Sequence, residues 1–290
     1  MSISRLAGPV AVVLFFTGLS GCSELTVEFT RDYDKAPYLP SPITYVDKML
    51  ALAKAGPDDV IYDLGSGDGR IPIRAAERFG VKKGVGIEID PALVKRSNDN
   101  ARKAGVADRV RFVRGDVFKV DFREATVVTL YLLPSMNLQL RPRLYSELKP
   151  GTRIVAHRFG LGSWKPDRAI LADDHPVVPV NYGDDDLVHL MLWIVPATAG
   201  GEWRLTAGTH DIRLSLKQDF QELSGTLTVG GYETGVTGRL AAERLRFESA
   251  GENGGRLQPV RFEGRLSDNG MRGTLTFDGR RFPATATRVR

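Results

Sequence analysis

The spacing of apolar and polar positions changes twice along the chain. In ITYVDKMLALA, residues 43–53, the apolar positions follow a helical spacing, which predicts an amphipathic helix that Gly56 and Pro57 end. From residue 59 to residue 160, short apolar runs alternate with helical patterns. Strict alternation of strand and helix is typical of a doubly wound, mostly parallel sheet.

The predicted elements of this region follow a regular order. Strands are expected at DVIYDLG, GVGIEID, RVRFVRGD, ATVVTLYLLP and TRIVAHRFG, and two more at PVVPVNY and HLMLWIVP. Helices are expected at IPIRAAERFG, closed by Gly80, at PALVKRSNDNARKAG, capped by Asp90, and at MNLQLRPRLYSELKPG, which Pro142 interrupts or begins. We therefore expect an α/β domain over residues 43–198, with a Rossmann-like, mostly parallel seven-stranded sheet.

The second change in spacing follows Ala199-Gly200-Gly201. Period-two alternation dominates from there to the end, and Gly-rich turns separate short strands. A weak internal echo joins SGTLT (224–228), TGRL (237–240), EGRL (263–266) and RGTLT (272–276). This pattern predicts a small all-β domain over residues 202–290, an antiparallel barrel or sandwich of seven or eight strands.

The stretch YDLGSGDGRI, residues 62–71, joins the first predicted strand to a helix. Its glycines, Gly65, Gly67 and Gly69, allow a ligand to approach bare backbone. A dinucleotide fingerprint places its third glycine where this chain has Arg70, and Asp63 and Asp68 would repel a pyrophosphate. A ligand with a positive centre and an amino-acid group, such as S-adenosylmethionine, fits this loop better.

Two further acids end the next predicted strands. Glu88 can accept both hydroxyls of a ribose, and Asp116 can accept from the exocyclic amine of adenine, with the Val117 N–H directed at the ring. Ligands of open α/β sheets bind beyond the carboxyl ends of the strands, where all these positions fall.

With these motifs, residues 38 to about 165 resemble a class I S-adenosylmethionine-dependent methyltransferase. PYLPSP, the helix after it and LYLLP resemble a narrower branch with bacterial proteins and mitochondrial protein-lysine methyltransferases. The resemblance implies S-adenosylmethionine as cofactor, with contacts from Asp63, Gly65, Ser66, Gly67, Gly69, Glu88, Asp116 and Val117. It also implies that the segment from Tyr38 to Pro42 covers the cofactor or the acceptor.

Residues for the transfer step are expected after the fourth and fifth predicted strands. Many amino-group methyltransferases have Asn/Asp-Pro-Pro-Tyr after the fourth strand, whereas this chain has LYLLP, which disfavours planar nucleobase amines as acceptors. Candidate catalytic residues are Tyr131, to wall the acceptor, Asn137, to orient it, and His157, to take a proton. A hydrogen-bonded structural histidine and a core tyrosine are the alternatives.

The first 22 residues resemble a bacterial lipoprotein signal. Arg5 precedes an apolar stretch from Leu6 to Leu19, too short to span a bilayer comfortably, and LSGC places Cys22, the only cysteine, at the position that receives lipid. We expect a signal peptide at 1–21, a tether and lead-in at 22–42, and a membrane-anchored lipoprotein facing the periplasm or cell exterior. Without processing of the signal, the protein would stay cytoplasmic.

The charge and composition of the chain disfavour two classes of partner, nucleic acids and metal ions. The net charge is +5, but Lys and Arg are scattered, so no nucleic-acid partner is expected. No metal is expected either, because GDDD at 183–186, with His175 and His189 nearby, has no recurring ligand spacing. The predicted function is methyl transfer to a protein side chain such as lysine, or to a small molecule. A lipid-anchored scaffold without activity is the alternative, and a dinucleotide oxidoreductase is disfavoured.

Overall fold

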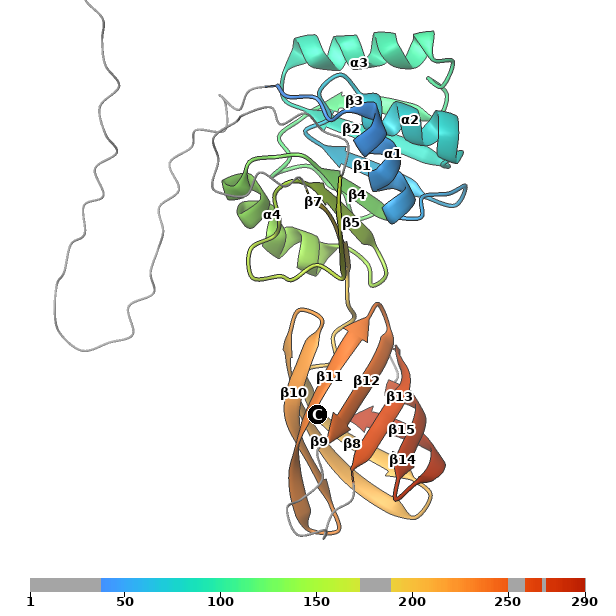
Figure 1. Ribbon diagram of the computed structural model, residues 1–290, viewed down its shortest axis with the longest axis vertical. Helices are drawn as coiled ribbons and strands as arrows, with labels where there is room; N and C mark the ends of the chain where they lie inside the picture. The colour runs from blue at the N-terminus through green and yellow to red at the C-terminus, as the bar shows by residue number, and fades with distance from the viewer. Residues whose placement is uncertain (1–37, 173–188, 250–258, 268–269, 290) are drawn as a thin grey trace, which may run out of the picture.

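The computed structural model describes residues 38–172, 189–249, 259–267 and 270–289. Several predictions concern other residues: the signal peptide with Cys22, the PVVPVNY strand, and the GDDD motif with His175 all lie outside the described chain. Figure 1 shows two bodies stacked along the long axis, an α/β body above and a β-barrel below.

The α/β body contains four described helices and seven described strands. The helices are α1 (Ile43–Leu52), α2 (Arg70–Phe79), α3 (Pro91–Lys103) and α4 (Pro134–Glu147). The strands are β1 (Val60–Leu64), β2 (Lys83–Glu88), β3 (Val110–Arg114), β4 (Val127–Leu130), β5 (Arg153–His157), β6 (Arg168–Leu171) and β7 (His189–Ile194).

The seven strands form one sheet in the order β3-β2-β1-β4-β5-β7-β6. The first five are parallel, and β7 pairs antiparallel with both β5 and β6. The prediction of a Rossmann-like, mostly parallel sheet is confirmed. HLMLWIVP supplies β7, whereas β6 was not predicted, because it has only three apolar residues in a row and its four residues are mostly exposed.

The helices cover both faces of this sheet. Apolar residues of α1, α2 and α3 pack with Ile61, Val127 and Val155 on one face. Apolar residues of α4 pack with Leu64 and Leu130 on the other. Burial on both faces explains why the central strands read as continuous apolar runs.

Local signals place the helix ends. Asp90 caps α3 by accepting from the Ala92 N–H at 2.7 Å, and Pro91 is its first residue, as predicted. Gly80 ends α2 with φ +63°, also as predicted. Pro142 neither begins nor ends α4, which runs through it, so the prediction of a boundary there is wrong. The loss of one backbone donor at Pro142 is outweighed by the burial of Leu140 and Leu144.

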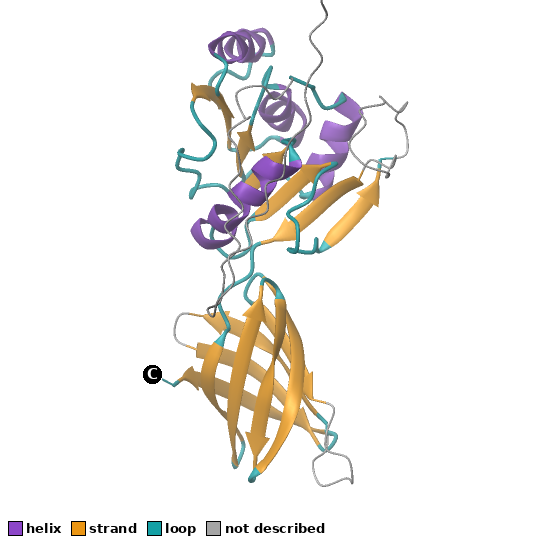
Figure 2. Cartoon of the chain, turned by 90° about the vertical axis from the view of Figure 1, so that its left-hand side faces the viewer, coloured by secondary structure: helices purple, strands orange, loops and turns teal. Residues whose placement is uncertain are grey.

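The barrel consists of eight antiparallel strands (Figure 2). They are β8 (Gly201–Ala207), β9 (His210–Asp219), β10 (Glu222–Val229), β11 (Tyr232–Ala241), β12 (Arg244–Ser249), β13 (Val260–Ser267), β14 (Gly270–Phe277) and β15 (Arg280–Arg288). Each strand pairs with the next, and β15 pairs with β8 to close the barrel. The interior is packed with apolar side chains such as Trp203, Leu227 and Phe262.

The sequence echo marks places where barrel strands approach closely. A Cβ at Gly225 would stand 1.8 Å from the Ser215 carbonyl oxygen, and one at Gly273 would stand 2.2 Å from the Glu263 oxygen. Gly238 and Gly264 meet backbone oxygens in the same way, each at 2.5 Å. Glycine is therefore required once in each copy of the echo, where the strands bend to close the barrel.

The barrel is joined to the α/β body by specific contacts. The Arg239 guanidinium pairs with Asp167 at 2.6 Å, and the Gln221 side-chain amide donates to the Lys165 carbonyl at 2.7 Å. Among the described residues, no helix is both long and apolar enough to cross a membrane.

Candidate active site

A hollow lies at the carboxyl ends of β1 and β4. The sheet order reverses between these two strands, which is where ligands of open α/β sheets bind. The hollow is lined by the lead segment Tyr38–Ser41, by the loop from Asp63 to Ile71, and by Tyr131. The structure thus brings the glycine loop and the predicted acceptor residue Tyr131 together in one place.

The three loop glycines all have left-handed backbone conformations, with φ of +85° at Gly65, +53° at Gly67 and +82° at Gly69. Added Cβ atoms would also collide with side chains. A Cβ at Gly65 would stand 2.6 Å from Leu132, and a Cβ at Gly67 would stand 2.5 Å from the Tyr38 ring. The loop therefore needs glycine both for its turn and for the close approach of the covering residues.

Glu88 ends β2 directly beside the glycine loop. One carboxylate oxygen accepts from the Gly67 N–H at 2.8 Å, and the other accepts from the N–H groups of Ile89 and Asp90. Glu88 is only 8% exposed, and Oε2 can still accept a further bond, whereas Oε1 already accepts two. It is thus held where a ribose over the loop would meet it.

Asp63 lies at the buried base of the hollow. It is 2% exposed and accepts from the Thr129 hydroxyl at 2.7 Å. Burial, together with the nearby carboxylates of Glu88 and Asp68, raises the pKa of Asp63 to about 7, although the Thr129 hydrogen bond acts in the lowering direction. A ligand carrying positive charge would favour the ionised form of this carboxyl group.

Arg70, which replaces the third dinucleotide glycine, ties the loop to the lead segment. It forms a bidentate ion pair with Asp68 and donates to the Ser41 carbonyl at 2.8 Å. Burial alone would raise the pKa of Asp68, but the hydrogen bonds and charge of Arg70 outweigh it and hold that pKa below its usual value. Burial and Asp68, which hydrogen-bonds the phenol, raise the pKa of Tyr38. The lead segment is therefore fastened over the loop at both ends.

The remaining predicted cofactor residues lie at other points of the rim. Ser66 lines the hollow, and its buried hydroxyl lies close to Gly86, without a hydrogen-bond partner among the described residues. Asp116 and Val117 follow β3, next to β2, and do not line the hollow. There, Asp116 Oδ1 accepts from the Phe118 N–H at 2.9 Å.

Two of the predicted catalytic residues stand together. The rings of Tyr131 and His157 overlap, with centroids 3.9 Å apart and planes 30° apart, and burial raises the pKa of Tyr131. His157 is 3% exposed, and its Nδ1 lies 2.8 Å from the hydroxyl oxygen of Ser41, which is equally buried. The imidazole thus lies behind Tyr131 and is held by the lead segment.

Asn137 is placed differently. Its side-chain amide donates to the Phe159 carbonyl at 2.9 Å and, more weakly, to that of Gly160, and the residue is fully buried. It is not among the residues that line the hollow. In this position Asn137 fastens α4 to the segment after β5 and does not face an acceptor.

These features fit S-adenosylmethionine. The loop glycines present backbone without a Cβ, Asp63 offers a carboxylate to a positive group, and Glu88 is preset beside the loop. In the part of the chain that the structure describes, no cluster of His, Cys, Asp and Glu is arranged to hold a metal ion.

Comparison with known proteins identifies the fold's relatives. The ANTKMT methyltransferase domain family matches residues 63–168. A protein-lysine N-methyltransferase of the archaeon Saccharolobus islandicus is 49% identical over 138 residues, which are 48% of this chain and 86% of the archaeal enzyme. This chain belongs to that methyltransferase family. It is an S-adenosylmethionine-dependent methyltransferase.

Other relatives share the same part of the methyltransferase. The adenine nucleotide translocase lysine N-methyltransferase of mouse is 36% identical over 132 residues, 46% of this chain and 57% of the mouse enzyme. The chain thus spans little more than half the length of this animal relative. A solved RNA methyltransferase of Salinibacter ruber, in complex with S-adenosyl-L-homocysteine, is 51% identical and covers 55% of this chain and 95% of its own, with a TM-score of 0.49.

Sequence reasoning missed three residues of the methyltransferase site: Ser41, Thr129 and Tyr45. Ser41 and Thr129 hydrogen-bond His157 and Asp63 from 116 and 66 residues away, and Tyr45 meets the His157 ring edge-on at 5.3 Å. Small hydroxyl residues carry no local pattern, so only the fold brings them to these partners. The proline-rich lead segment was the available signal for Ser41.

Proposed function

We propose that this enzyme methylates lysine side chains of proteins. The observation that carries the substrate class is its 49% identity to an archaeal enzyme that acts as a protein-lysine N-methyltransferase, over most of that enzyme's length. The site is compatible with such an acceptor. Among the residues after β4 that the structure describes, only Tyr131 lines the hollow, and its ring can flank a slender aliphatic amine.

The chain's own residues have two tasks in this reaction. S-adenosylmethionine supplies a sulfonium methyl group, which an amine lone pair attacks in line. The loop of Gly65 and Gly67 and the carboxylate of Glu88 fix the donor, while Tyr38 and Tyr131 exclude water. Loss of water also lowers the pKa of the acceptor amine, which must be neutral to attack.

The proton of the acceptor amine needs a route away from the hollow. We propose that His157, behind Tyr131 and paired with Ser41, receives it. Tyr131 then orients the amine, and Asn137 supports the site through the segment that follows His157.

The test is transfer of a labelled methyl group from S-adenosylmethionine to cell-envelope protein, followed by acid hydrolysis and identification of the labelled amino acid. Label on lysine, lost in the Gly67→Arg variant, is the expected result. Label on RNA or on lipid would contradict the substrate class. Binding of the cofactor without any transfer would favour the scaffold alternative instead.

We further propose that the enzyme is a lipoprotein anchored through Cys22 and facing the periplasm or cell exterior. The LSGC sequence after a short apolar stretch supports this location. A Cys22→Ala variant should then leave the membrane fraction. If the variant stays with the membrane, the lipid anchor is refuted and an unprocessed signal accounts for the sequence better.

A further inference from the structure

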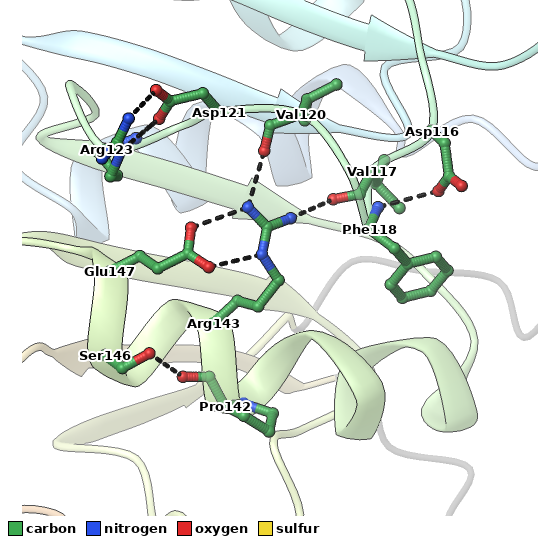
Figure 3. A network of polar contacts seen from close by, with 10 residues as sticks. All are labelled: Asp116, Val117, Phe118, Val120, Asp121, Arg123, Pro142, Arg143, Ser146 and Glu147. Atoms are coloured by element: carbon green, nitrogen blue, oxygen red, sulfur yellow. Dashed lines mark hydrogen bonds and ion pairs between the residues drawn. The ribbon is translucent and has the colours of Figure 1, made fainter.

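Arg143 of α4 hydrogen-bonds the backbone of the segment that follows β3. Its guanidinium donates to the Val120 carbonyl at 2.9 Å and, at 3.4 Å, to the Val117 carbonyl. It also forms a bidentate pair with Glu147, at 2.7 and 2.8 Å, and lies 4.6 Å from the ring centroid of Phe122. Figure 3 shows this arginine lying between α4 and the segment.

Besides Arg143, the segment is held by Val117 and Phe122, which are buried in the apolar core beside α4, and by the Asp116 carbonyl, which accepts from the N–H groups of Lys119 and Val120. Between Gly115 and Thr126 the chain has neither helix nor strand, so no regular backbone ladder fixes it. From within, Asp116 accepts from the Phe118 N–H and shapes the first turn. From outside, Arg143 holds the carbonyl group of Val117, inside that turn, and that of Val120 shortly after it.

Asp116 and Val117 are the residues expected at the adenine end of the cofactor. A carboxylate there accepts from the exocyclic amine, and a backbone N–H donates to the adjacent ring nitrogen. A 6-oxo base presents the opposite pattern on this edge, an acceptor in place of the amine and an N–H in place of the ring acceptor. Discrimination therefore depends on how precisely the two residues are held.

We propose that Arg143 is a positioning residue that sets the selectivity of the cofactor site for adenine. It holds the backbone of Val117 from the side opposite the ligand, and with it the adjoining Asp116. This inference rests on the proposed placement of the cofactor along β1, β2 and β3. The forked guanidinium matters more than its charge, because a lysine ammonium on a flexible stem cannot hold two carbonyl groups and both oxygens of Glu147 at once.

The test uses the full chain and two ligands, S-adenosylhomocysteine and its 6-oxo analogue S-inosylhomocysteine, with affinities measured by calorimetric titration. The wild type should prefer the adenine ligand by about 10- to 100-fold, the range expected for paired hydrogen-bond discrimination. Arg143→Ala should weaken binding of S-adenosylhomocysteine and lower this preference at least about threefold. Arg123→Ala is the matched control, since it removes an exposed arginine paired with Asp121 on the same segment and should change neither value.

Arg143→Lys serves as a second variant in case Arg143→Ala does not fold, because lysine keeps a positive charge beside Glu147. A folded Arg143→Lys or Arg143→Ala protein with the wild-type preference would overturn the positioning role. Equal weakening of both ligands would overturn it too, since that is the signature of a merely structural arginine. If the wild type binds no S-adenosylhomocysteine, the proposed cofactor placement fails, and this inference falls with it.

Discussion

The ring of Phe220 stacks on the indole of Trp164, with centroids 5.1 Å apart and planes only 5° apart. Phe220 belongs to the turn between β9 and β10 of the barrel, and Trp164 to the segment after β5 of the methyltransferase body. Tyr145 of α4 meets the same phenyl ring edge-on at 5.2 Å, and the Arg141 guanidinium lies 5.7 Å from its centroid. Phe220 of the barrel therefore packs against the two segments that follow Tyr131 and His157, which are α4 and the segment after β5.

Removal of the Phe220 ring should destabilise the adjoining part of the methyltransferase body, although Phe220 itself lies in the barrel. Phe220→Ala removes an aromatic ring that is partly buried, so we expect a loss of about 2 kcal/mol, below the cost at a fully buried site. Hydrogen exchange of residues 159–165 should become faster. Phe282→Ala, a partly buried ring on the barrel's own core, is the control and should leave that exchange unchanged. Unaltered protection in Phe220→Ala would show that the stack does not hold the segment.

Gly67→Ala should abolish cofactor binding. At φ +53° a Cβ is strained, and here it would also stand 2.5 Å from the Tyr38 ring. Gly80→Ala is a matched control, because Gly80 has φ +63° but no atom within 4 Å of an added Cβ. The control isolates the conformational cost of about 1 kcal/mol, and its affinity for S-adenosylmethionine should equal that of the wild type. Equal affinities of the two variants, by calorimetry, would contradict the close approach at the loop.

The sequence predicted the central strands and the glycine loop well, because their signals are local. The apolar runs of β1 and β4 and the glycines between Asp63 and Arg70 follow directly from burial on both faces and from left-handed turns. The exposed strand β6 and the continuation of α4 through Pro142 were not predictable in this way. Both depend on pairing or packing with residues distant in sequence, which a local pattern does not contain.

The pairing of Ser41 with His157 should matter more for transfer than for cofactor binding. Ser41→Ala leaves a buried imidazole nitrogen without its 2.8 Å partner, a cost of about 1–3 kcal/mol. We expect the rate of label transfer to fall at least about tenfold, with a much smaller change in the affinity for S-adenosylmethionine. Ser163→Ala, which removes an exposed hydroxyl bonded to Arg141, should retain the wild-type rate. A parallel loss of rate and affinity in Ser41→Ala would place Ser41 in the cofactor site instead.

Asp63 should make the free enzyme less stable as pH rises from about 4 to about 7. Its pKa is near 3.8 in the unfolded chain, and burial raises it to about 7 in the folded protein. Between these values the folded protein keeps a proton that the unfolded chain releases, so the stability that this proton provides is lost as pH rises through about 7. At 1.36 kcal/mol per pKa unit the effect is at most about 4 kcal/mol.

The measurement is the free energy of unfolding by urea, at several pH values, for the wild type and Asp63→Asn. An asparagine can still accept from Thr129 but carries no charge, so its stability relative to the wild type should improve from pH 4 to pH 8. Asp121→Asn should show no such trend between pH 4 and pH 8, because the Arg123 guanidinium holds the pKa of the exposed Asp121 below its usual value, and that stabilisation is lost only as pH falls below about 4. A pH-independent difference between Asp63→Asn and the wild type would show that Asp63 is already ionised in the folded protein at pH 4, and that the polar base of the hollow, not its burial, sets the charge offered to the cofactor.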